Sequence, residues 1–287
     1  MKEGFKTMAK DFTRRAFLGM GAGALWTPRE LAAQLEKIEF SFIHVTDTHV
    51  SRERLYDPRR GFDVPAEESI RRCRAAVEEI NRCSLPHELI VHTGDVAHTR
   101  DTNDDFDLAR ELHVFKKTAY YVPGNHDLGY SQTGQFRPAF EERFGKANQA
   151  FEPVAGLRLA MFDSQPLDPR AGPEDREQAF RELDRILTPP KPTILCCHVM
   201  GLESFYLNKL ADGWPASLMQ RWTNRMKTGG VFAVLAGHFH RDEYQHVNGI
   251  DFHLAGPVIN FWGRQTCFRH WTLSQGALTY RTVYLEL

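Results

Sequence analysis

The chain has 287 residues, of which 42% are hydrophobic and 25% are charged, and its formal net charge is −1. This length and composition are typical of a soluble globular protein with one large α/β domain or two small ones. A net charge so close to zero provides no overall basic field, so we expect no specific nucleic-acid binding, and an anionic substrate has to be attracted locally.

The N-terminal segment predicts export. Residues 13–18, Thr-Arg-Arg-Ala-Phe-Leu, resemble the twin-arginine signal, although Gly19 replaces the usual lysine at its last position. The apolar stretch 16–26 is too short to span a bilayer and suits the hydrophobic region of a signal, the alternative being an amphipathic helix. We assign residues 1–35 to the signal, with a poor cleavage site at Ala32-Ala33. We expect the twin-arginine export machinery as a partner, a periplasmic or otherwise exported protein without stable membrane insertion, and a cytoplasmic one if the signal does not function.

Strands and helices alternate through the first half of the chain. The predicted strands are 38–45, 89–91 and 119–122, and the predicted helices are 66–82 and 104–112. In the first helix, Ile70, Cys73, Val77 and Ile80 recur at spacings of three and four. A β-α-β-α-β order favours a parallel sheet with right-handed crossovers, in which ligands gather at the carboxyl ends of the strands.

The second half is less regular. Its predicted elements are a hairpin over 150–162, helices 174–187 and 218–227, strands 193–197 and 231–236, and two hairpins that turn at Asn248-Gly249 and Gln275-Gly276. The long loop 199–216 contains Phe205, Tyr206 and Trp214, which either cover a site or fill a small local core. The sequence shows no linker or repeat, so we expect one domain, 36–287, with two sheets face to face and helices outside.

The five cysteines are predicted to be free thiols. Their odd number and irregular spacing argue against a disulfide framework.

Five short polar pieces follow apolar runs and are rich in metal-binding residue types. They are Asp-Thr-His at 47–49, Gly-Asp at 94–95, Gly-Asn-His-Asp at 124–127, His198, and Gly-His-Phe-His at 237–240. In an extended segment Asp47 and His49 point the same way and can address one cation. A single carboxylate such as Asp95 can bridge two ions, and Asn125 offers a neutral oxygen.

In this order the pieces resemble the calcineurin-like metallophosphoesterases over about residues 38–262. The resemblance implies an α/β fold, a four-layer α-β-β-α sandwich of two mixed β-sheets flanked by helices. It implies two metal ions, iron, manganese or zinc. It also implies two ligand sets, namely Asp47, His49, Asp95 and His240 for one ion, and Asp95, Asn125, His198 and His238 for the other. By the same resemblance His126 is the catalytic histidine, and we expect Asp127 to orient it.

The resemblance implies hydrolysis of phosphoester bonds by a hydroxide that bridges the two ions, with His126 protonating the leaving oxygen. The compact chain is most similar to the bacterial cyclic-nucleotide phosphodiesterase branch, so the predicted activity is that of a phosphodiesterase. The alternatives are a broad-specificity phosphomonoesterase and a non-catalytic metal-binding scaffold. His98 could also reach the substrate, whereas His44 and His92 are predicted to lie in the core or behind the ligands.

Overall fold

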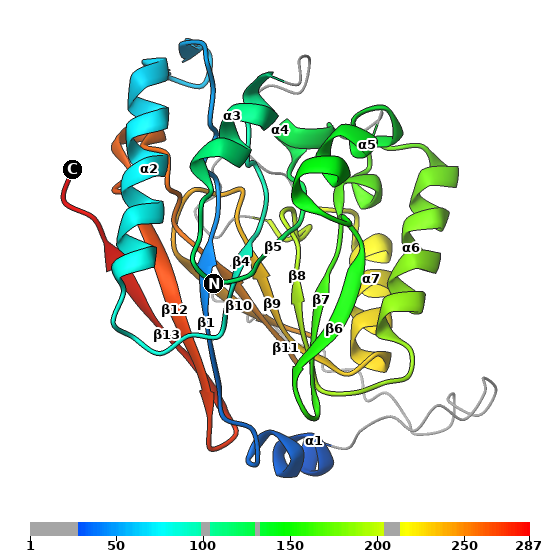
Figure 1. Ribbon diagram of the computed structural model, residues 1–287. Coiled ribbons are helices and arrows are strands. Elements are labelled where there is room, and N and C mark those ends of the chain that lie inside the picture. The colour runs from blue at the N-terminus through cyan, green and yellow to red at the C-terminus, as the bar shows by residue number, and fades with distance from the viewer. Residues whose placement is uncertain (1–27, 99–103, 130–132, 204–212) are drawn as a thin grey trace, which may run out of the picture.

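The computed structural model describes residues 28–98, 104–129, 133–203 and 213–287. Within them, two β-sheets lie face to face and helices cover their outer faces (Figure 1). The strand order is β13-β12-β1-β4-β5 in the first sheet and β10-β11-β9-β8-β7-β6 in the second. This arrangement confirms the predicted sandwich of two mixed sheets flanked by helices.

The first sheet combines the predicted parallel unit with the C-terminal hairpin. Its strands are β1 (Phe40–Val45), β4 (Leu89–His92), β5 (Ala119–Tyr121), β12 (Cys267–Ser274) and β13 (Ala277–Tyr284). β1, β4 and β5 pair in parallel, and β12 adds to β1 in the antiparallel sense. The carboxyl ends of β1, β4 and β5 therefore share one edge, as the β-α-β-α-β order predicted.

The second sheet is parallel in its interior and antiparallel at both edges. Its strands are β6 (Gln149–Val154), β7 (Leu157–Met161), β8 (Thr193–Cys196), β9 (Val231–Ala236), β10 (Glu243–Val247) and β11 (Ile250–Leu254). β7, β8, β9 and β11 run in parallel, and β6 and β10 close the two edges. Asn248 and Gly249 both have positive φ, which matches the predicted two-residue hairpin turn.

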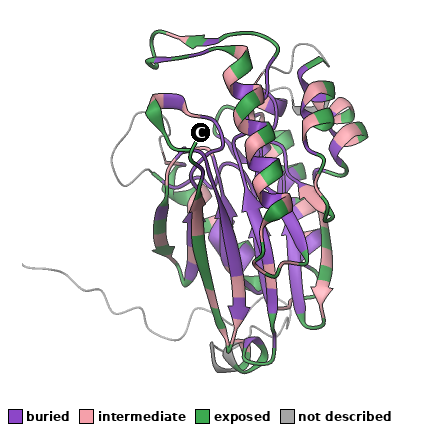
Figure 2. Ribbon diagram, turned by 60° about the vertical axis from the view of Figure 1, so that its left-hand side comes forward, coloured by how far each residue is buried: buried purple, intermediate pink, exposed green. Residues whose placement is uncertain are grey.

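Alternation along β1 separates two of the apolar layers. Phe40 and Phe42 pack between the sheets, whereas Ile43 and Val45 pack on the outer face with Ala76 of α2 (Ala66–Arg82). α3 (Asp104–Leu112) lies on the same side of the molecule (Figure 1). α6 (Pro173–Leu187) and α7 (Ala216–Thr228) cover the second sheet. Figure 2 shows the strands of the interior mainly buried and the outward faces of the helices exposed.

Several elements have no counterpart among the predictions. They are α1 (Pro28–Leu35), β2 (Leu55–Asp57), β3 (Phe62–Val64), α4 (Asn125–Leu128), α5 (Thr133–Phe144), and the short 3₁₀ turns η1 (Gln165–Leu167) and η2 (Phe261–Gly263). α5 contains Pro138, which argues against a helix when only the sequence is considered. Phe140 nevertheless packs 6.1 Å from Phe106 of α3 between ring centroids, so tertiary contacts stabilise the helix.

α1 differs from its expected surroundings, and Trp214 follows one of the two alternatives left open for its loop. α1 lies within the residues assigned to the signal, yet its Leu35 is buried and packs with Leu31 against the apolar layer between the sheets. Trp214 is only 6% exposed and lies 6.1 Å from Trp222 between ring centroids, so this aromatic fills a local core and does not cover a site. The predicted signal motif, Phe205 and Tyr206 lie outside the described residues.

No helix in the described part of the chain is long and apolar enough to cross a bilayer. The cysteines carry free thiols, and all are buried except the half-buried Cys83.

Candidate metal centre

The polar pieces gather at the carboxyl ends of strands from both sheets. One ligand atom from each of Asp47, His49, Asp95 and His240 lies within 4.8 Å of the others, and the same holds for Asp95, His198 and His238. These two groups contain every predicted ligand except Asn125. Asp95 belongs to both, which is the arrangement expected of a carboxylate that bridges two cations.

The two oxygens of Asp95 have different partners. Oδ1 accepts a hydrogen bond of 2.8 Å from the backbone N–H of His126. Oδ2 lies 3.4 Å from Nε2 of His49 and 3.1 Å from Nε2 of His198. The hydrogen bond to Oδ1 therefore fixes the carboxylate, and Oδ2 is shared between the two groups of ligands.

His240 joins the second sheet to Asp47 and His49. Its Nε2 lies 3.2 Å from Oδ1 of Asp47 and 3.2 Å from Nε2 of His49. The other oxygen of Asp47, Oδ2, accepts hydrogen bonds from the backbone N–H of His238 at 3.1 Å and from the hydroxyl of Thr46 at 2.8 Å. Two imidazole nitrogens and a carboxylate oxygen thus converge on one small volume, as ligands of a divalent cation do.

Asn125 supplies an acceptor that the protein leaves without a donor. Its Oδ1 is buried and has no hydrogen-bond partner among the described residues. Buried polar atoms are nearly always satisfied, so this orphan acceptor calls for a ligand. The oxygen and imidazole donors of this centre fit iron, manganese or zinc, and they do not choose among them.

Glycines allow the loops to approach so closely. A Cβ at Gly124 would lie 2.1 Å from Oδ1 of Asp95, and one at Gly237 would lie 2.0 Å from Oγ1 of Thr46. Neither separation is possible for real atoms. A larger residue at either position would therefore push the ligand loops apart.

The backbone of the candidate ligands is strained. Positive φ angles occur at Asp47 (54°), His49 (41°), Asp95 (51°), His238 (72°) and His240 (52°). For residues other than glycine this region is sparsely populated and costs roughly 1–3 kcal/mol each, so it persists only where the surroundings impose it. The concentration of such angles at the predicted ligands sets these residues apart from the rest of the described chain, where positive φ at non-glycine residues is confined to Trp262 and the two hairpin turns.

Burial and neighbouring charges set the protonation of the cluster. Burial alone would raise the pKa of Asp47, but His240, His49 and His198 hold it well below its ordinary value. Burial lowers the pKa of His238 to about 3 and that of His49 to about 4, which favours the neutral imidazole that binds metals. His198 differs, because burial lowers its pKa but Asp95, Asp47 and the carbonyl of Thr93 together outweigh that effect and raise the pKa to about 9.

A layer of residues behind the ligands fixes their orientation. Nδ1 of His198 donates to the backbone carbonyl of Thr93 at 2.6 Å, which directs Nε2 toward Asp95. Nδ1 of His92 accepts from the backbone N–H of Gly94 at 3.2 Å, and Nε2 of His44 lies 2.7 Å from Oγ1 of Thr93. The histidines at 44 and 92 thus lie in the core behind the centre, as predicted. The hydrogen bonds through Thr93 could not be read from the sequence.

The surroundings of His126 differ from expectation. Oδ1 of Asp127 accepts from the backbone N–H of Ala97 at 3.0 Å, and Oδ2 accepts from those of Val96 at 3.1 Å and Gly124 at 2.7 Å. Asp127 therefore ties together the loops that follow β4 and β5 and does not orient the imidazole.

The ring of His126 is held instead by the carbonyl oxygen of His98, which lies 2.9 Å from its Nδ1. The His98 ring is partly exposed, 4.5 Å from the His126 ring between centroids, with its Nδ1 3.1 Å from Nδ1 of His49. His98 therefore borders the centre.

Stacked sheets with two ligand sets that share one carboxylate define the fold and centre of a dinuclear metallohydrolase. Residues 40–256 match the calcineurin-like phosphoesterase family, and the chain belongs to it. The family and the metal-binding cluster together support a hydrolase that acts on phosphoric ester bonds.

Comparison with individual proteins gives more distant likenesses. The chain is 27% identical over 214 residues to the zebrafish (Danio rerio) serine/threonine-protein phosphatase CPPED1, a match that covers 67% of this chain and 66% of that protein. The rat protein of the same name is 25% identical over 214 residues, covering 69% of this chain and 68% of the relative. The chain thus spans about two thirds of the length of these relatives.

Solved structures share the fold. A dimetal phosphatase from Danio rerio superposes with a TM-score of 0.63 at 16% identity, covering 85% of this chain and 95% of that one. GAP50, an anchor in the inner membrane complex of Plasmodium, gives a TM-score of 0.59 at 12% identity, with 86% and 85% covered. The same fold therefore occurs in a protein described as an anchor, so an activity has to be argued from the residues of the site.

Proposed function

We propose that this chain is a dinuclear metal-dependent phosphoesterase whose substrates are phosphomonoesters. The observation that carries the proposal is the position of Oδ2 of Asp95, within 3.4 Å of imidazoles from both ligand sets. Two ions held there would lower the pKa of water and neutralise charge on the phosphoryl group. The relatives named as phosphatases favour the monoester as substrate.

The residues have separate tasks in this proposal. Asp47, His49, Asp95 and His240 would hold one ion, and Asp95, Asn125, His198 and His238 the other. His126 would act as the general acid. Its Nδ1 is engaged with the carbonyl of His98, so the proton for the leaving oxygen would come from Nε2. Asp127 would keep the loop that carries Asn125 and His126 fixed relative to Asp95.

A phosphodiester is the second candidate substrate, in line with the sequence resemblance to the bacterial cyclic-nucleotide branch. A cavity of about 680 Å³ opens beside His240 and would leave room for a second ester substituent. The two candidates are separated by hydrolysis of p-nitrophenyl phosphate and bis-p-nitrophenyl phosphate.

The test uses protein reconstituted separately with iron, manganese and zinc. We expect faster turnover of the monoester, and much slower turnover of both esters by the Asp95→Asn variant treated with the same metals. A clear preference for the diester, or for cyclic nucleotides, would replace the monoester as the substrate class. Metal binding without hydrolysis of either ester would reject the enzymatic proposal and support the alternative of a non-catalytic metal-binding scaffold.

We further propose export of the folded protein by the twin-arginine machinery. The support is the Thr-Arg-Arg-Ala-Phe-Leu motif at 13–18 followed by a short apolar stretch. Replacing Arg14 and Arg15 by lysine should retain the protein in the cytoplasm, whereas the unchanged chain should reach the periplasm of a bacterial host. Equal distribution of the two proteins between the fractions would contradict this proposal, without bearing on the enzymatic one.

A further inference from the structure

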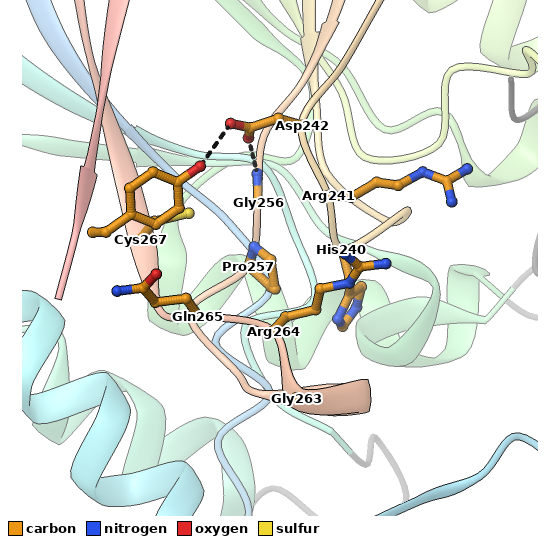
Figure 3. A pocket seen from close by; sticks show the side chains of 10 residues that line it. His240, Arg241, Asp242, Gly256, Pro257, Gly263, Arg264, Gln265 and Cys267 are labelled. Atoms are coloured by element: carbon orange, nitrogen blue, oxygen red, sulfur yellow. Dashed lines mark hydrogen bonds between the residues drawn. The ribbon is translucent and has the colours of Figure 1, made fainter. Parts of the chain in front are cut away.

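The cavity beside the metal centre has the size of a small-molecule site. It encloses about 680 Å³, within the range of roughly 300–1,000 Å³ that is common for such sites. His240 forms part of its wall, so the cavity adjoins the candidate ligands (Figure 3). Its charged lining residues are Arg241, Asp242 and Arg264.

The negative charge in this cavity is already neutralised. Oδ1 of Asp242 lies 3.0 Å from Nη2 of the buried Arg269 and accepts from the backbone N–H of Gly256 at 2.9 Å. Oδ2 accepts from the hydroxyls of Thr282 and Tyr284 at 3.2 and 3.3 Å. Figure 3 shows Asp242 and Gly256 together on one side of the cavity. Asp242 is therefore committed to the protein and presents no unbalanced charge to a ligand.

The two arginines of the cavity differ. Nε of Arg241 lies 3.1 Å from Oε2 of Glu243, so that guanidinium is paired. The side chain of Arg264 is exposed and has no carboxylate within 4.0 Å among the described residues. Once the two ion pairs are accounted for, the cavity is left with the positive charge of Arg264.

Contacts with the metal centre hold the segment that precedes Arg264. The Phe261 ring stacks on the His240 ring with centroids 5.3 Å apart, and it also lies 5.0 Å from the His49 ring. Trp262 packs edge-on against His240 at 5.4 Å, and its indole N–H donates to the carbonyl of Arg60 at 2.7 Å. Arg264 is thereby anchored through its neighbours to two of the candidate ligands.

The same segment carries backbone strain. Trp262 has φ 55° and ψ 29°, a left-handed conformation that is rare for a bulky residue. Gly263 continues at φ 70°, and the backbone N–H of Arg264 then returns to the carbonyl of Phe261 at 3.1 Å. This tight turn, imposed against a local preference, sets the starting point of the Arg264 side chain next to the cavity, and such strain is often stored at functional sites.

We propose that this cavity receives the part of the substrate beyond the phosphoryl group, and that this part carries a second anion, a carboxylate or a further phosphate, bound by Arg264. The inference rests on the proposed function and adds a substrate class to it. A guanidinium presents a planar fork of donors that matches a carboxylate or phosphate in two-point contact. Substrates that end in a neutral alcohol would leave this charge unpaired.

The test compares two probes that differ in one group, 3-phosphoglycerate and glycerol 3-phosphate. The metal-loaded protein should have the higher kcat/KM for 3-phosphoglycerate. Arg264→Ala should lower kcat/KM for 3-phosphoglycerate about tenfold, whereas kcat/KM for glycerol 3-phosphate should change by less than about twofold. Arg264→Lys keeps the charge but loses the planar fork of donors. Its kcat/KM for 3-phosphoglycerate should lie between the values of the unchanged protein and of Arg264→Ala. Equal effects of Arg264→Ala on both probes would overturn the inference.

Arg281→Ala is the matched control. Arg281 is exposed on β13, and alternation along the strand places it on the face opposite Thr282 and Tyr284, away from the cavity. Arg281→Ala removes the same charge as Arg264→Ala but at a position away from the cavity. We therefore expect this control variant to keep the preference for 3-phosphoglycerate. A loss of preference equal to that of Arg264→Ala would assign the effect to overall charge and contradict a site at Arg264.

A binding measurement separates this inference from the proposed activity. Calorimetric titration of the metal-loaded His126→Ala protein should show 3-phosphoglycerate bound more tightly than glycerol 3-phosphate, and the additional Arg264→Ala change should abolish the difference. If the unchanged protein hydrolyses neither these probes nor the two p-nitrophenyl esters but this difference persists, the proposed activity fails and the selective binding by Arg264 stands. Equal affinities in the presence of Arg264 would refute the cavity inference alone.

Discussion

The metal centre and the cavity meet at His240 and are built in different ways. The centre is assembled from short pieces at strand ends of both sheets, and its carboxylates and most of its imidazoles are buried. The cavity is formed largely by turns after β9 and β11 and carries the exposed Arg264. Its one unbalanced charge faces solvent, whereas the two carboxylates of the centre are buried among imidazoles. The centre can therefore set the reaction, and the cavity can choose among substrates.

This difference predicts how substitutions divide. A change in the centre should affect all phosphoesters alike, because it acts on the group that they share. A change in the cavity should alter the ratio between substrates, because it contacts only what differs among them.

Asp95→Asn should give the largest loss. The amide oxygen can still accept from the backbone N–H of His126, but the charged oxygen shared by the two ligand sets disappears. We expect kcat/KM to fall by more than about 100-fold on every ester and bound metal to decrease, since even changes behind a ligand cost about 10–100-fold. Metal analysis and kinetics on two esters check this, and retention of two ions with normal turnover would contradict it.

His126→Ala should retain metal and lose about 10²–10⁴-fold in turnover of esters with poor leaving groups, which is the usual contribution of a general acid. The loss should be smaller for an activated aryl ester, whose leaving oxygen needs no proton. Kinetics with p-nitrophenyl phosphate and an alkyl phosphate measure the contrast. Equal losses on both would argue against a general-acid role.

Removal of metal should destabilise the chain. A cation at about 100 times its dissociation constant stabilises the folded state by about 2.7 kcal/mol per site. We expect a chelator to lower the melting temperature of the unchanged protein and to leave that of Asp95→Asn nearly unaffected. If both proteins respond equally, the stabilising ions bind elsewhere.

Asp127→Asn should reduce stability by about 2–4 kcal/mol, because its amide cannot accept all the backbone N–H bonds that the buried carboxylate accepts from Val96, Ala97 and Gly124. Asp63→Asn is the control, since the exposed ion pair of Asp63 with Arg54 is screened by solvent and should contribute little to stability. Denaturant unfolding measures both. A loss of turnover without loss of stability in Asp127→Asn would restore a direct role toward His126.

The smallest effect concerns the strained backbone. At the positive φ of His238, glycine should be favoured over alanine by about 1 kcal/mol in the metal-free protein, the reverse of the usual order. Unfolding of His238→Gly and His238→Ala under chelation decides the sign. Greater stability of the alanine variant would show that the ligand loop relaxes easily.

The sequence predicted the parallel strands and the ligand pieces because each depends on local patterns. The 17-residue helix α2 matches the predicted range 66–82, since its apolar residues recur at helical spacing. The order of Asp47, Asp95 and His198 at strand ends was enough to expect one shared edge. These features need no knowledge of which distant segments touch.

The rest depends on contacts between distant segments. The carbonyl of His98 that holds His126, the backbone amides that surround Asp127 and the buried position of Trp214 all arise from tertiary packing. Arg264 has no recognisable motif, and its position follows from the contacts of Phe261 with His240 and His49. Substrate selectivity is therefore the part of the function that the sequence reveals least.

The most direct test of the centre is anomalous diffraction from crystals of metal-reconstituted protein. We expect two peaks about 3.5–4 Å apart, the spacing typical of paired catalytic ions. The carboxylate of Asp95 should lie between them, with His240 bound to one ion and Asn125 to the other. A single peak, or two peaks that do not share Asp95, would contradict the proposed dinuclear centre.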